Sequence, residues 1–586
     1  MSSYHAPTDE MMFLLQQVFD APSVWQTLPA LADNIDIDTA AAILEEAAKI
    51  NGELVAPLNR TGDEQGVRFT GGQVFTPDGY RDAYRQYAEG GWVGLCGEPE
   101  FGGMGMPKML GVLVDELGYS ANNAFNLYGS LTAGAALCIH AHGDDELKQR
   151  FLPGLYSGEW AGAMDMTEPQ AGSDLRYIST KAEPQADGSY SISGSKIFIT
   201  GGDHDLTANI IHLVLAKIAG SDGISLFVVP KIKVDAAGNC TEANGVSAGA
   251  IEHKMGLKAS ATCVMNYDNA EGFLVGRANR GLVCMFTMMN YERLSIGIQG
   301  LGSAQAAYRM AADYAKERLQ GSDSSNAQQQ APIIVHGDVR RMLLNCRCLT
   351  DAGRALAVFT GLQLDLAKYS QDEAQKAYAT KLAALLTPVT KAFLTDRGLE
   401  CAISAQQVFG GHGYIRETGI EQWVRDTRIA QIYEGTNGIQ AIDFLGRKLV
   451  ADRLVTITEL FNQLSLQLAQ SSDVPSHLIA QQQTMQDDFL AAMHEVMAAK
   501  DDDSNLINAV AVDALDAFGY LMCGYFWLLM QQTAKQQQST LPEAWVTGKS
   551  QLAEYYFARL APRFAMHLVS VRAGSTATMQ VDIAAF

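Results

Sequence analysis

Glu434 is the single acidic residue of a stretch that could carry acid–base chemistry. Residues 428–440 read Arg-Ile-Ala-Gln-Ile-Tyr-Glu-Gly-Thr-Asn-Gly-Ile-Gln. Gly435 predicts a tight turn directly after Glu434, and Thr436 or Asn437 can cap the apolar helix expected to follow. A carboxylate with few solvating neighbours has a raised pKa and is a stronger base. Glu434 is therefore predicted to remove a weakly acidic proton from carbon.

Three further segments argue against an ordinary surface turn at Glu434. They are Met164-Asp-Met-Thr-Glu-Pro-Gln-Ala-Gly-Ser-Asp174, Lys196-Ile-Phe-Ile-Thr-Gly201 and Gln407-Val-Phe-Gly-Gly-His-Gly-Tyr414. Together with Tyr433-Glu-Gly-Thr436 they resemble the acyl-CoA dehydrogenase family over about residues 75–450. The resemblance implies a flavoenzyme that introduces a double bond between the α and β carbons of an acyl-CoA.

The cofactor implied by this resemblance is FAD, which needs hydrogen bonds to its pyrimidine edge and N5, an apolar wall and anion-binding groups. The backbone of Met164 and Met166 and the hydroxyl of Thr167 match the family positions that face the pyrimidine ring. Ser173 matches a residue that approaches the phosphates of both flavin and CoA. Without the resemblance, Thr167 and Ser173 are ordinary turn residues.

Phe198 and Thr200 are predicted at the flavin ring. By resemblance, Phe198 packs against the isoalloxazine and Thr200 places its hydroxyl near N5. Read alone, an aromatic residue in an alternating strand is more often an ordinary core residue. Thr436 and Asn437 are also assigned to the cofactor by resemblance.

A second chain is expected to complete each flavin site. Arg318 matches a family arginine that reaches the FAD pyrophosphate, commonly that of the neighbouring subunit, although a cation at a helix C-terminus explains it as well. The glycine-rich run with Gln407, Gly410 and Gly411 can approach the adenosine half of FAD. These assignments imply a homodimer, with a tetramer as the less favoured state.

The base has one rival, Glu292, which precedes Arg293 where some family members carry their catalytic carboxylate. Glu434 is favoured because its Tyr-Glu-Gly-Thr context is kept, and Glu292 is expected to pair with Arg293 or another helix neighbour. Arg293, Tyr433 and Gly435 are assigned to the acyl-CoA, with Ser173. By resemblance, the Glu434 amide and a flavin ribityl hydroxyl polarise the thioester carbonyl.

One departure from the family pattern concerns the CoA phosphates. Gly446 stands where family members often carry a basic residue, and Arg447 comes one position late. The residues that hold the CoA phosphates are therefore left unassigned.

The implied reaction gives a trans-2-enoyl-CoA, as in β-oxidation of fatty acids, and electrons pass to electron-transferring flavoprotein. The expected substrate is a straight-chain acyl-CoA. The N-terminal residues Tyr4–Leu14 and the C-terminal extension resemble the branch of large bacterial enzymes that includes those acting on 3-methylmercaptopropionyl-CoA, which is the alternative substrate. Two further hypotheses are an acyl-CoA oxidase, in which oxygen accepts the electrons, and a non-catalytic flavoprotein of the same fold.

Composition limits the partners. The net charge of −22 speaks against nucleic acid and anionic membranes, which need clustered Lys and Arg. Nine cysteines without a Cys-x-x-Cys pair predict reduced thiols, a cytoplasmic protein and no metal site. Asp513 and Asp516 interrupt the most apolar stretch, residues 509–530, which favours a core helix over a membrane span.

Hydrophobic periodicity places these motifs on an α+β, mainly helical fold. Four domains are predicted: a helical N-terminal domain (1–160), an antiparallel β domain (161–277), a helix bundle with the base (278–455) and an extra C-terminal helical domain (456–586). Residues 320–330 are predicted to form a polar loop between two bundle helices.

Overall fold

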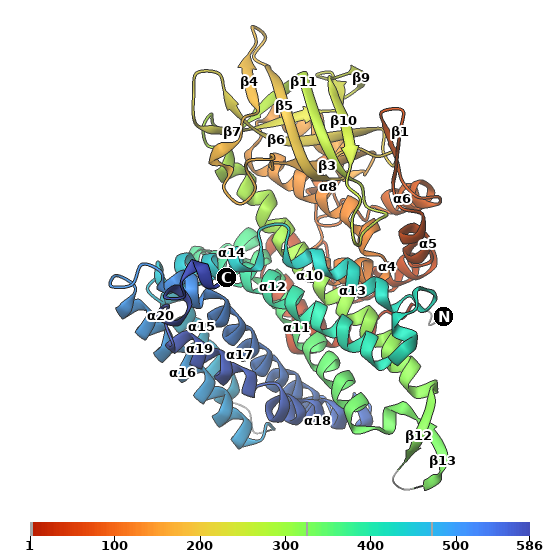
Figure 1. The fold of residues 1–586 in the computed structure, drawn as a ribbon, viewed down its shortest axis with the longest axis vertical. Coiled ribbons are helices and arrows are strands. Elements are labelled where there is room, and N and C mark those ends of the chain that lie inside the picture. The colour runs from red at the N-terminus through yellow and green to blue at the C-terminus, as the bar shows by residue number, and fades with distance from the viewer. Residues whose placement is uncertain (1–3, 324–325, 470–472) are drawn as a thin grey trace. The chain divides into compact units, whose positions relative to one another are not determined.

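The computed structural model describes residues 4–323, 326–469 and 473–586 and confirms the mainly helical α+β class (Figure 1). The chain divides into two compact units. The β unit contains residues 46–106 and 117–295, and the helical unit contains residues 1–45, 107–116 and 296–586. The divisions fall inside α4 (Ile37–Ile50), just before and inside α7 (Lys108–Ala121), and inside α10 (Gly281–Glu317).

Most helices of the β unit precede its sheet in sequence, and the first part of α10 follows it. Besides parts of α4 (Ile37–Ile50), α7 and α10 they are α5 (Pro57–Gln65), α6 (Tyr80–Glu89), α8 (Asn123–His142) and α9 (Asp145–Tyr156). α8 packs on the sheet, against β3 (Trp160–Asp165) (Figure 1). Asn122 separates α7 from α8, because its side chain caps α8 by accepting from the backbone N–H of Phe125.

Seven strands form the main sheet of this unit, in the order β10-β11-β5-β4-β6-β3, with β7 paired to β11 and β6. The strands are β3, β4 (Lys181–Pro184), β5 (Tyr190–Thr200), β6 (Asn209–Ile218), β7 (Ile224–Pro230), β10 (Val246–Ile251) and β11 (Thr262–Val275). Two small hairpins accompany it, β1 (Arg68–Thr70) with β2 (Gln73–Phe75) and β8 (Ile232–Val234) with β9 (Cys240–Ala243). The prediction of an antiparallel domain was wrong in part, because β6 pairs in parallel with both β3 and β4. Of the three partners of β6, β3 and β4 run in the same direction as β6 and β7 runs in the opposite one. The periodicity of a strand does not reveal the direction of its partners.

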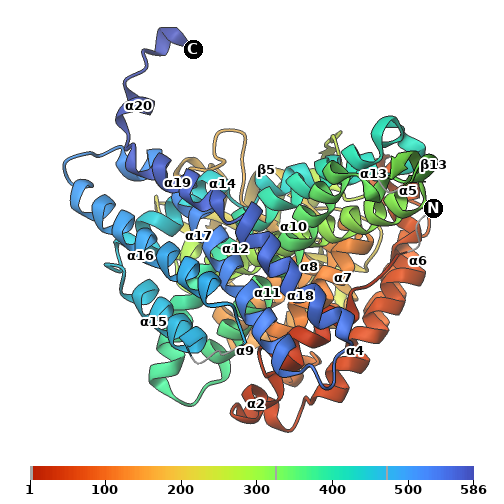
Figure 2. The ribbon, with the colours of Figure 1, turned by 90° about the horizontal axis from the view of Figure 1, so that it is seen from below.

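The helical unit contains the long bundle helices and the C-terminal helices. The bundle consists of α10, α11 (Gly337–Tyr369), α12 (Glu373–Val408), α13 (Ile420–Arg428) and α14 (Asn437–Ile442), followed by the π-helical η9 (Asp443–Val450). The C-terminal helices, which Figure 2 shows side by side, are α15 (Val455–Ala469), α16 (Ser476–Ala499), α17 (Leu506–Gln536), α18 (Glu543–Arg559) and α19 (Pro562–Arg572). The short helices α1 (Thr8–Met12), α2 (Ala21–Gln26) and α3 (Pro29–Ala32) open this unit, and α20 (Thr576–Met579) follows α19.

The most apolar helix, α17, is a core helix, as predicted. It is long and apolar enough to cross a membrane by length and composition, but 72% of its most apolar window is buried. Figure 2 shows it among the other C-terminal helices.

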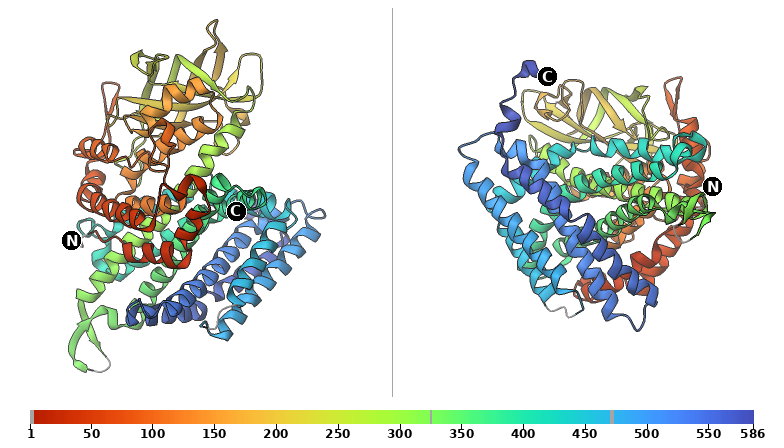
Figure 3. Two further views of the ribbon diagram at one scale, coloured as in Figure 1. Left: turned by 180° about the vertical axis from the view of Figure 1, so that it is seen from behind. Right: turned by 60° about the horizontal axis from the view of Figure 1, so that its bottom comes forward.

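The predicted polar loop at residues 320–330 is instead a hairpin. β12 (Leu319–Asp323) pairs antiparallel with β13 (Asn326–Pro332), and Figure 3 shows the hairpin extending beyond the helices of its unit. The Gln-rich sequence did not predict strands here, because both faces of an exposed hairpin can be polar and its residues then show no alternation of apolar and polar side chains. Residues 324–325 lie outside the described residues.

Buried charges join distant parts of the helical unit. Arg354 donates to both carboxylate oxygens of Glu116, at 2.6 and 2.8 Å. Lys549 on α18 lies 2.6 Å from the Glu10 carboxylate and 3.3 Å from that of Asp351. These pairs bring the beginning, the middle and the end of the unit to one place.

α10 and α12 approach each other closely at glycines of the helical unit. A Cβ on Gly297 would lie 2.6 Å from the Thr390 carbonyl oxygen, and one on Gly300 would lie 2.6 Å from that of Leu394. The missing side chains therefore let the two backbones touch, which fixes the position of α12.

Gly300→Ala is expected to destabilise the protein by about 1–3 kcal/mol, because the added methyl meets backbone that cannot yield cheaply. The measurement is the urea midpoint of the purified protein. Gly548→Ala is the matched control, because Gly548 lies inside α18 with open space around it. That variant is expected to be neutral or more stable by up to about 1 kcal/mol. Equal midpoints for the two variants would contradict a close helix contact.

Candidate active site

Glu434 lies on a left-handed turn between two short helices of the helical unit. The φ angles of Glu434 and Gly435 are +57° and +82°. The 3₁₀ helix η8 (Ile429–Gln431) precedes the turn and α14 follows it. The Thr436 hydroxyl accepts the backbone N–H of Ile439, so the predicted cap of α14 is confirmed. A non-glycine residue at positive φ is costly and often marks a functional site.

The turn is held by side chains from three helices, α14, α12 and α10. Gln440 on α14 donates from Nε2 to the Glu434 carbonyl at 3.0 Å. Lys391 on α12 donates from Nζ to the Gly435 carbonyl at 2.8 Å. Tyr433 donates its hydroxyl to Oε1 of Gln299 on α10 at 2.5 Å. Glu434 itself is half-buried, so its carboxylate is partly removed from water. This is a suitable setting for a general base.

Sequence reasoning missed Lys391, Gln440 and Gln299. Each side chain is fully buried, and no local motif in the sequence marks it as a partner of the turn.

The predicted flavin segment of the β unit leaves the sheet at the end of β3. Met164 belongs to that strand, and Met166, Thr167 and Ser173 follow it. Thr167 accepts the backbone N–H of Ile197 through its carbonyl, at 2.9 Å, which ties the segment to β5. Thr167 is half-buried and Ser173 is exposed, so both are accessible to a ligand.

A buried ion pair, missed by the sequence reasoning, anchors this segment. Lys196 on β5 lies 2.9 Å from Glu168, and the two side chains are 0% and 1% exposed. Lys196 also donates to the Met166 carbonyl at 3.1 Å. The Glu168 carboxylate accepts the hydroxyls of Ser179 and Thr180, both at 2.6 Å. Charge-assisted hydrogen bonds from Lys196 and to Glu168 therefore hold the segment that follows β3 in place.

Asp165 anchors the same segment from the interior of the sheet. It accepts the hydroxyl of Tyr267 at 2.6 Å and lies 3.1 Å from Nδ1 of His212. All three residues are buried, while alternation along the strand sends Met164 and Met166 to the opposite face.

Phe198 is the most unusual residue of β5. Its φ is +60° and it is 60% exposed, in the middle of a strand. A β-bulge accounts for this conformation, because Lys196 faces Met265 whereas Ile199 faces Cys263 on β11. Phe198 is therefore not a core residue. A strained and exposed aromatic ring fits the apolar wall that a flavin requires. Thr200 is half-buried two residues further along β5.

Acid is expected to weaken the Glu168 anchor. Burial would raise the pKa of Glu168, but the Lys196 ammonium and the hydroxyls of Ser179 and Thr180 outweigh burial and hold the pKa well below its usual 4.5. A carboxyl group whose pKa is lower in the folded than in the unfolded protein stabilises the folded state at every pH above the unfolded pKa. This stabilisation is lost as the pH falls below that value. The excess of the wild-type thermal midpoint over that of Glu168→Gln should therefore shrink as the pH falls below 4.5. Parallel pH curves for the two proteins would contradict this.

The rival acid Glu292 lies in the β unit, between α10 and α8. It is 1% exposed and accepts the Ser130 hydroxyl at 3.1 Å. Ser130 in turn shares a 2.7 Å hydrogen bond with Ser295. Arg293 donates to Oδ1 of Asn290 at 3.2 Å. Glu292 thus belongs to a hydroxyl network, whereas Glu434 lies on an accessible turn.

The remaining cofactor candidates lie at the far end of α12. Tyr314 of α10 stacks on Phe409, with ring centroids 4.2 Å apart. This contact brings the end of α10, with Arg318, to the end of α12, with Gln407, Gly410 and Gly411. All four are exposed. Along α12, this group is about 24 Å from Lys391 and the Glu434 turn, at 1.5 Å per residue.

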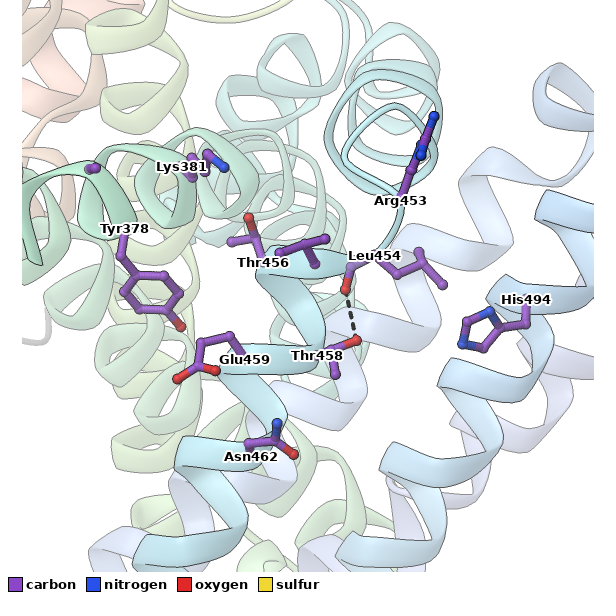
Figure 4. A pocket seen from close by; sticks show the side chains of 11 residues that line it. Tyr378, Lys381, Arg453, Leu454, Thr456, Thr458, Glu459, Asn462 and His494 are labelled. Atoms are coloured by element: carbon purple, nitrogen blue, oxygen red, sulfur yellow. Dashed lines mark hydrogen bonds between the residues drawn. The ribbon is translucent and has the colours of Figure 1, made fainter. Parts of the chain in front are cut away.

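Two cavities of the helical unit contain none of the predicted site residues. One of about 560 Å³ lies between α12, α15 and α16, with Tyr378, Lys381, Glu459 and His494 among its lining residues (Figure 4). Its lining carries charges of both signs. The other, of about 420 Å³, lies between the N-terminal segment and α18. Among the described residues, no group of three His, Cys, Asp or Glu side chains could hold a metal ion.

Comparisons with protein families identify the class of this protein. Acyl-CoA dehydrogenase models match in order: the N-terminal domain over residues 38–159, the middle domain over 163–270 and the C-terminal domain over 279–450. An acetyl-CoA dehydrogenase C-terminal-like model matches residues 460–582. The chain belongs to the acyl-CoA dehydrogenase family, which confirms the resemblance carried by the motifs. It is an FAD-dependent oxidoreductase that acts on acyl-CoA.

Individual relatives cover most of the chain. A 3-methylmercaptopropionyl-CoA dehydrogenase of Ruegeria pomeroyi is 42% identical over 533 residues, 89% of this chain and 90% of its own length. A broad-specificity linear acyl-CoA dehydrogenase of Mycobacterium tuberculosis is 34% identical over 526 residues, 86% of this chain and 85% of its own. The structure of an acyl-CoA dehydrogenase complexed with FAD from Bacillus anthracis covers 92% of this chain and 89% of its own, with a TM-score of 0.75 and 23% identity. That structure shares the fold.

Proposed function

We propose that this enzyme dehydrogenates an unbranched acyl-CoA to its trans-2-enoyl-CoA with Glu434 as the base. The observation that carries the proposal is the turn itself: a half-buried carboxylate at φ +57°, with its backbone held by Gln440 and Lys391. A structure that keeps a non-glycine residue at positive φ must hold it there by other contacts. The turn is built to present this carboxylate.

Glu434 takes the α-proton of the bound thioester. FAD, when bound, supplies the acceptor for the β-hydrogen, which leaves as hydride. Phe198, Thr167 and Ser173 on the β unit, with Met164, Met166 and Thr200, are the residues that would hold the flavin. Phe198 and Ser173 are exposed and Thr167, Met166 and Thr200 are half-buried, while Met164 is buried and would contribute its backbone. The Glu434 amide would donate to the thioester oxygen and stabilise the developing negative charge. Arg293, Tyr433 and Gly435 are proposed to contact the acyl-CoA.

The proposed substrate has an unbranched acyl chain. The 3-methylmercaptopropionyl group is itself unbranched and replaces one methylene of pentanoyl with sulfur, so one pocket can take both. Met285, Met288 and Met289 on α10 suit either chain, because methionine contacts alkyl groups and sulfur without a polar penalty. Met285 and Met288 are fully buried, so core packing explains two of the three. The Ruegeria relative is the observation that favours the thioether substrate as the second candidate.

Electron-transferring flavoprotein is the proposed acceptor, and a homodimer is the proposed assembly. The separation between the Glu434 turn and the Arg318–Gly411 group, about 24 Å along α12, supports two half-sites that serve different flavins. The nine cysteines are free and seven of them are buried, which suits a reducing cytoplasm. We also propose that the chain forms four domains, at residues 1–160, 161–277, 278–455 and 456–586.

The test is anaerobic titration of the purified protein with pentanoyl-CoA, 3-methylmercaptopropionyl-CoA, hexadecanoyl-CoA and the branched isovaleryl-CoA. Bleaching of the flavin with formation of 2-enoyl-CoA is expected for the unbranched substrates. A preference of more than about a hundredfold for the thioether, near 3 kcal/mol in transition-state binding, would assign the second candidate. Rapid reoxidation of the bleached protein in air would instead indicate an oxidase.

A further inference from the structure

Lys391 is a fully buried cation directly behind the Glu434 turn. Its exposure is 0%, and Nζ lies 2.8 Å from the Gly435 carbonyl oxygen and 2.8 Å from Oδ1 of Asn437. Removing an ammonium group from water costs several kcal/mol. A buried lysine that binds two atoms of one short turn therefore indicates a specific task at that turn.

Asn437 extends the contact of Lys391 along α12. Its Nδ2 donates to Oδ1 of Asp396 at 2.8 Å and to the Thr395 hydroxyl at 3.0 Å. The same oxygen of Asp396 accepts Nε2 of Gln431, at 2.6 Å. Lys391 and Asp396 thus bind the chain on both sides of Glu434, at residue 431 before it and at residues 435 and 437 after it. We call these four side chains, Lys391, Asp396, Gln431 and Asn437, the turn clamp.

The clamp acts on a backbone that would not hold its shape alone. A left-handed backbone conformation is strained at a residue such as Glu434, which has a Cβ. The carbonyl of Gly435 is the acceptor for Lys391, so the bond fixes the orientation of the peptide that follows the base. Thr436 and Asn437 then begin α14, and Gln440 returns from that helix to the Glu434 carbonyl.

We infer that Lys391 is a positioning residue for the Glu434 carboxylate, an inference that rests on the proposed role of Glu434 as the base. The ammonium holds the turn by its charge-assisted bond to the Gly435 carbonyl and by its bond to Asn437. A displacement of about 1 Å at a reacting group can lower the rate about a hundredfold. Loss of the clamp therefore affects proton abstraction more than substrate binding.

The test is Lys391→Met, which keeps the length of the side chain and removes its charge. Turnover of pentanoyl-CoA by the FAD-containing protein is expected to fall about tenfold to a hundredfold, with KM changed much less than kcat. Exchange of the substrate α-hydrogen with deuterated solvent should fall with it. Backbone amide exchange over residues 432–438, read by mass spectrometry, should become faster while flavin content is retained. Lys381→Met is the control on the same helix, because that side chain is 61% exposed.

The outcomes separate this inference from the proposed function. Wild-type turnover and amide exchange in Lys391→Met would overturn it, and so would a slower enzyme with unchanged amide exchange. Asn437→Ala removes the other arm of the clamp and must give the same pattern if Lys391→Met does not fold. If Glu434→Gln kept full turnover, the proposed base would fail, whereas faster amide exchange in Lys391→Met would still show that Lys391 holds the turn.

Discussion

Glu434→Gln should abolish flavin bleaching by acyl-CoA while leaving the flavin bound. The substitution keeps the size and shape of the side chain and removes its ability to take a proton. General-base catalysis contributes about 10²- to 10⁴-fold, so the rate constant for anaerobic flavin reduction should fall by that factor. Stopped-flow absorbance measures it directly. The residues assigned to the flavin ring lie in the β unit, so the bound cofactor should keep its spectrum.

Glu292→Gln is the control for this substitution. Glu292 is buried and accepts from Ser130, and a glutamine oxygen can accept the same hydroxyl. The rate of flavin reduction in Glu292→Gln is therefore expected to stay within about tenfold of the wild-type rate. The reverse pattern, with a fast Glu434→Gln and a slow Glu292→Gln, would make Glu292 the base.

Lys196→Met is expected to have the largest effect on stability and on flavin retention. It leaves the Glu168 carboxylate buried without its cation, and breaking a buried pair in this way costs about 3–5 kcal/mol. It also removes the donor to the Met166 carbonyl, which lies in the segment assigned to the flavin. The thermal midpoint should fall by about 6 °C or more, and the protein should purify with much less FAD.

Lys233→Met provides a matched comparison within the same unit. Lys233 lies 2.9 Å from Glu242, the same separation as Lys196 from Glu168, but these side chains are 32% and 72% exposed. Solvent screens such a pair, so its loss should cost at most about 1 kcal/mol. If Lys196→Met and Lys233→Met had the same thermal midpoint and both kept wild-type flavin content, the ion pair that holds residues 164–174 would have no energetic role.

The turn at Glu434 was easier to predict from the sequence than the side chains that hold it. The sequence predicts the turn at Glu434, the Thr436 cap and the helix that follows, because turns and helix caps depend on residues that are neighbours in the sequence. Lys391 lies 43 positions before Glu434 and Glu168 lies 28 before Lys196, so their pairing depends on how helices and strands pack. Local periodicity carries no information about such contacts.

Phe198 shows a different limit. Alternation in β5 predicts a buried ring, whereas the bulge against β11 rotates the residue outward. A bulge depends on the register between two strands that lie about 65 residues apart in sequence, and register is a tertiary property. The family motif predicts that Phe198 faces a flavin, which requires an exposed ring, whereas the residue pattern alone predicts a buried one. The parallel partners of β6 escaped prediction for the same reason.

The salt bridge between Glu10 and Lys549 ties together residues 539 positions apart. At about 5–20 residues per second, a ribosome needs roughly half a minute to two minutes to make the second residue after the first. During that time the Glu10 carboxylate lacks its Lys549 partner, and α18 does not yet exist. Arg347 on α11 also bonds to Glu10, so this part of the cluster can form earlier. The contact with α18 is added only after residue 549 has been synthesised, which makes it a late step in the assembly of the helical unit.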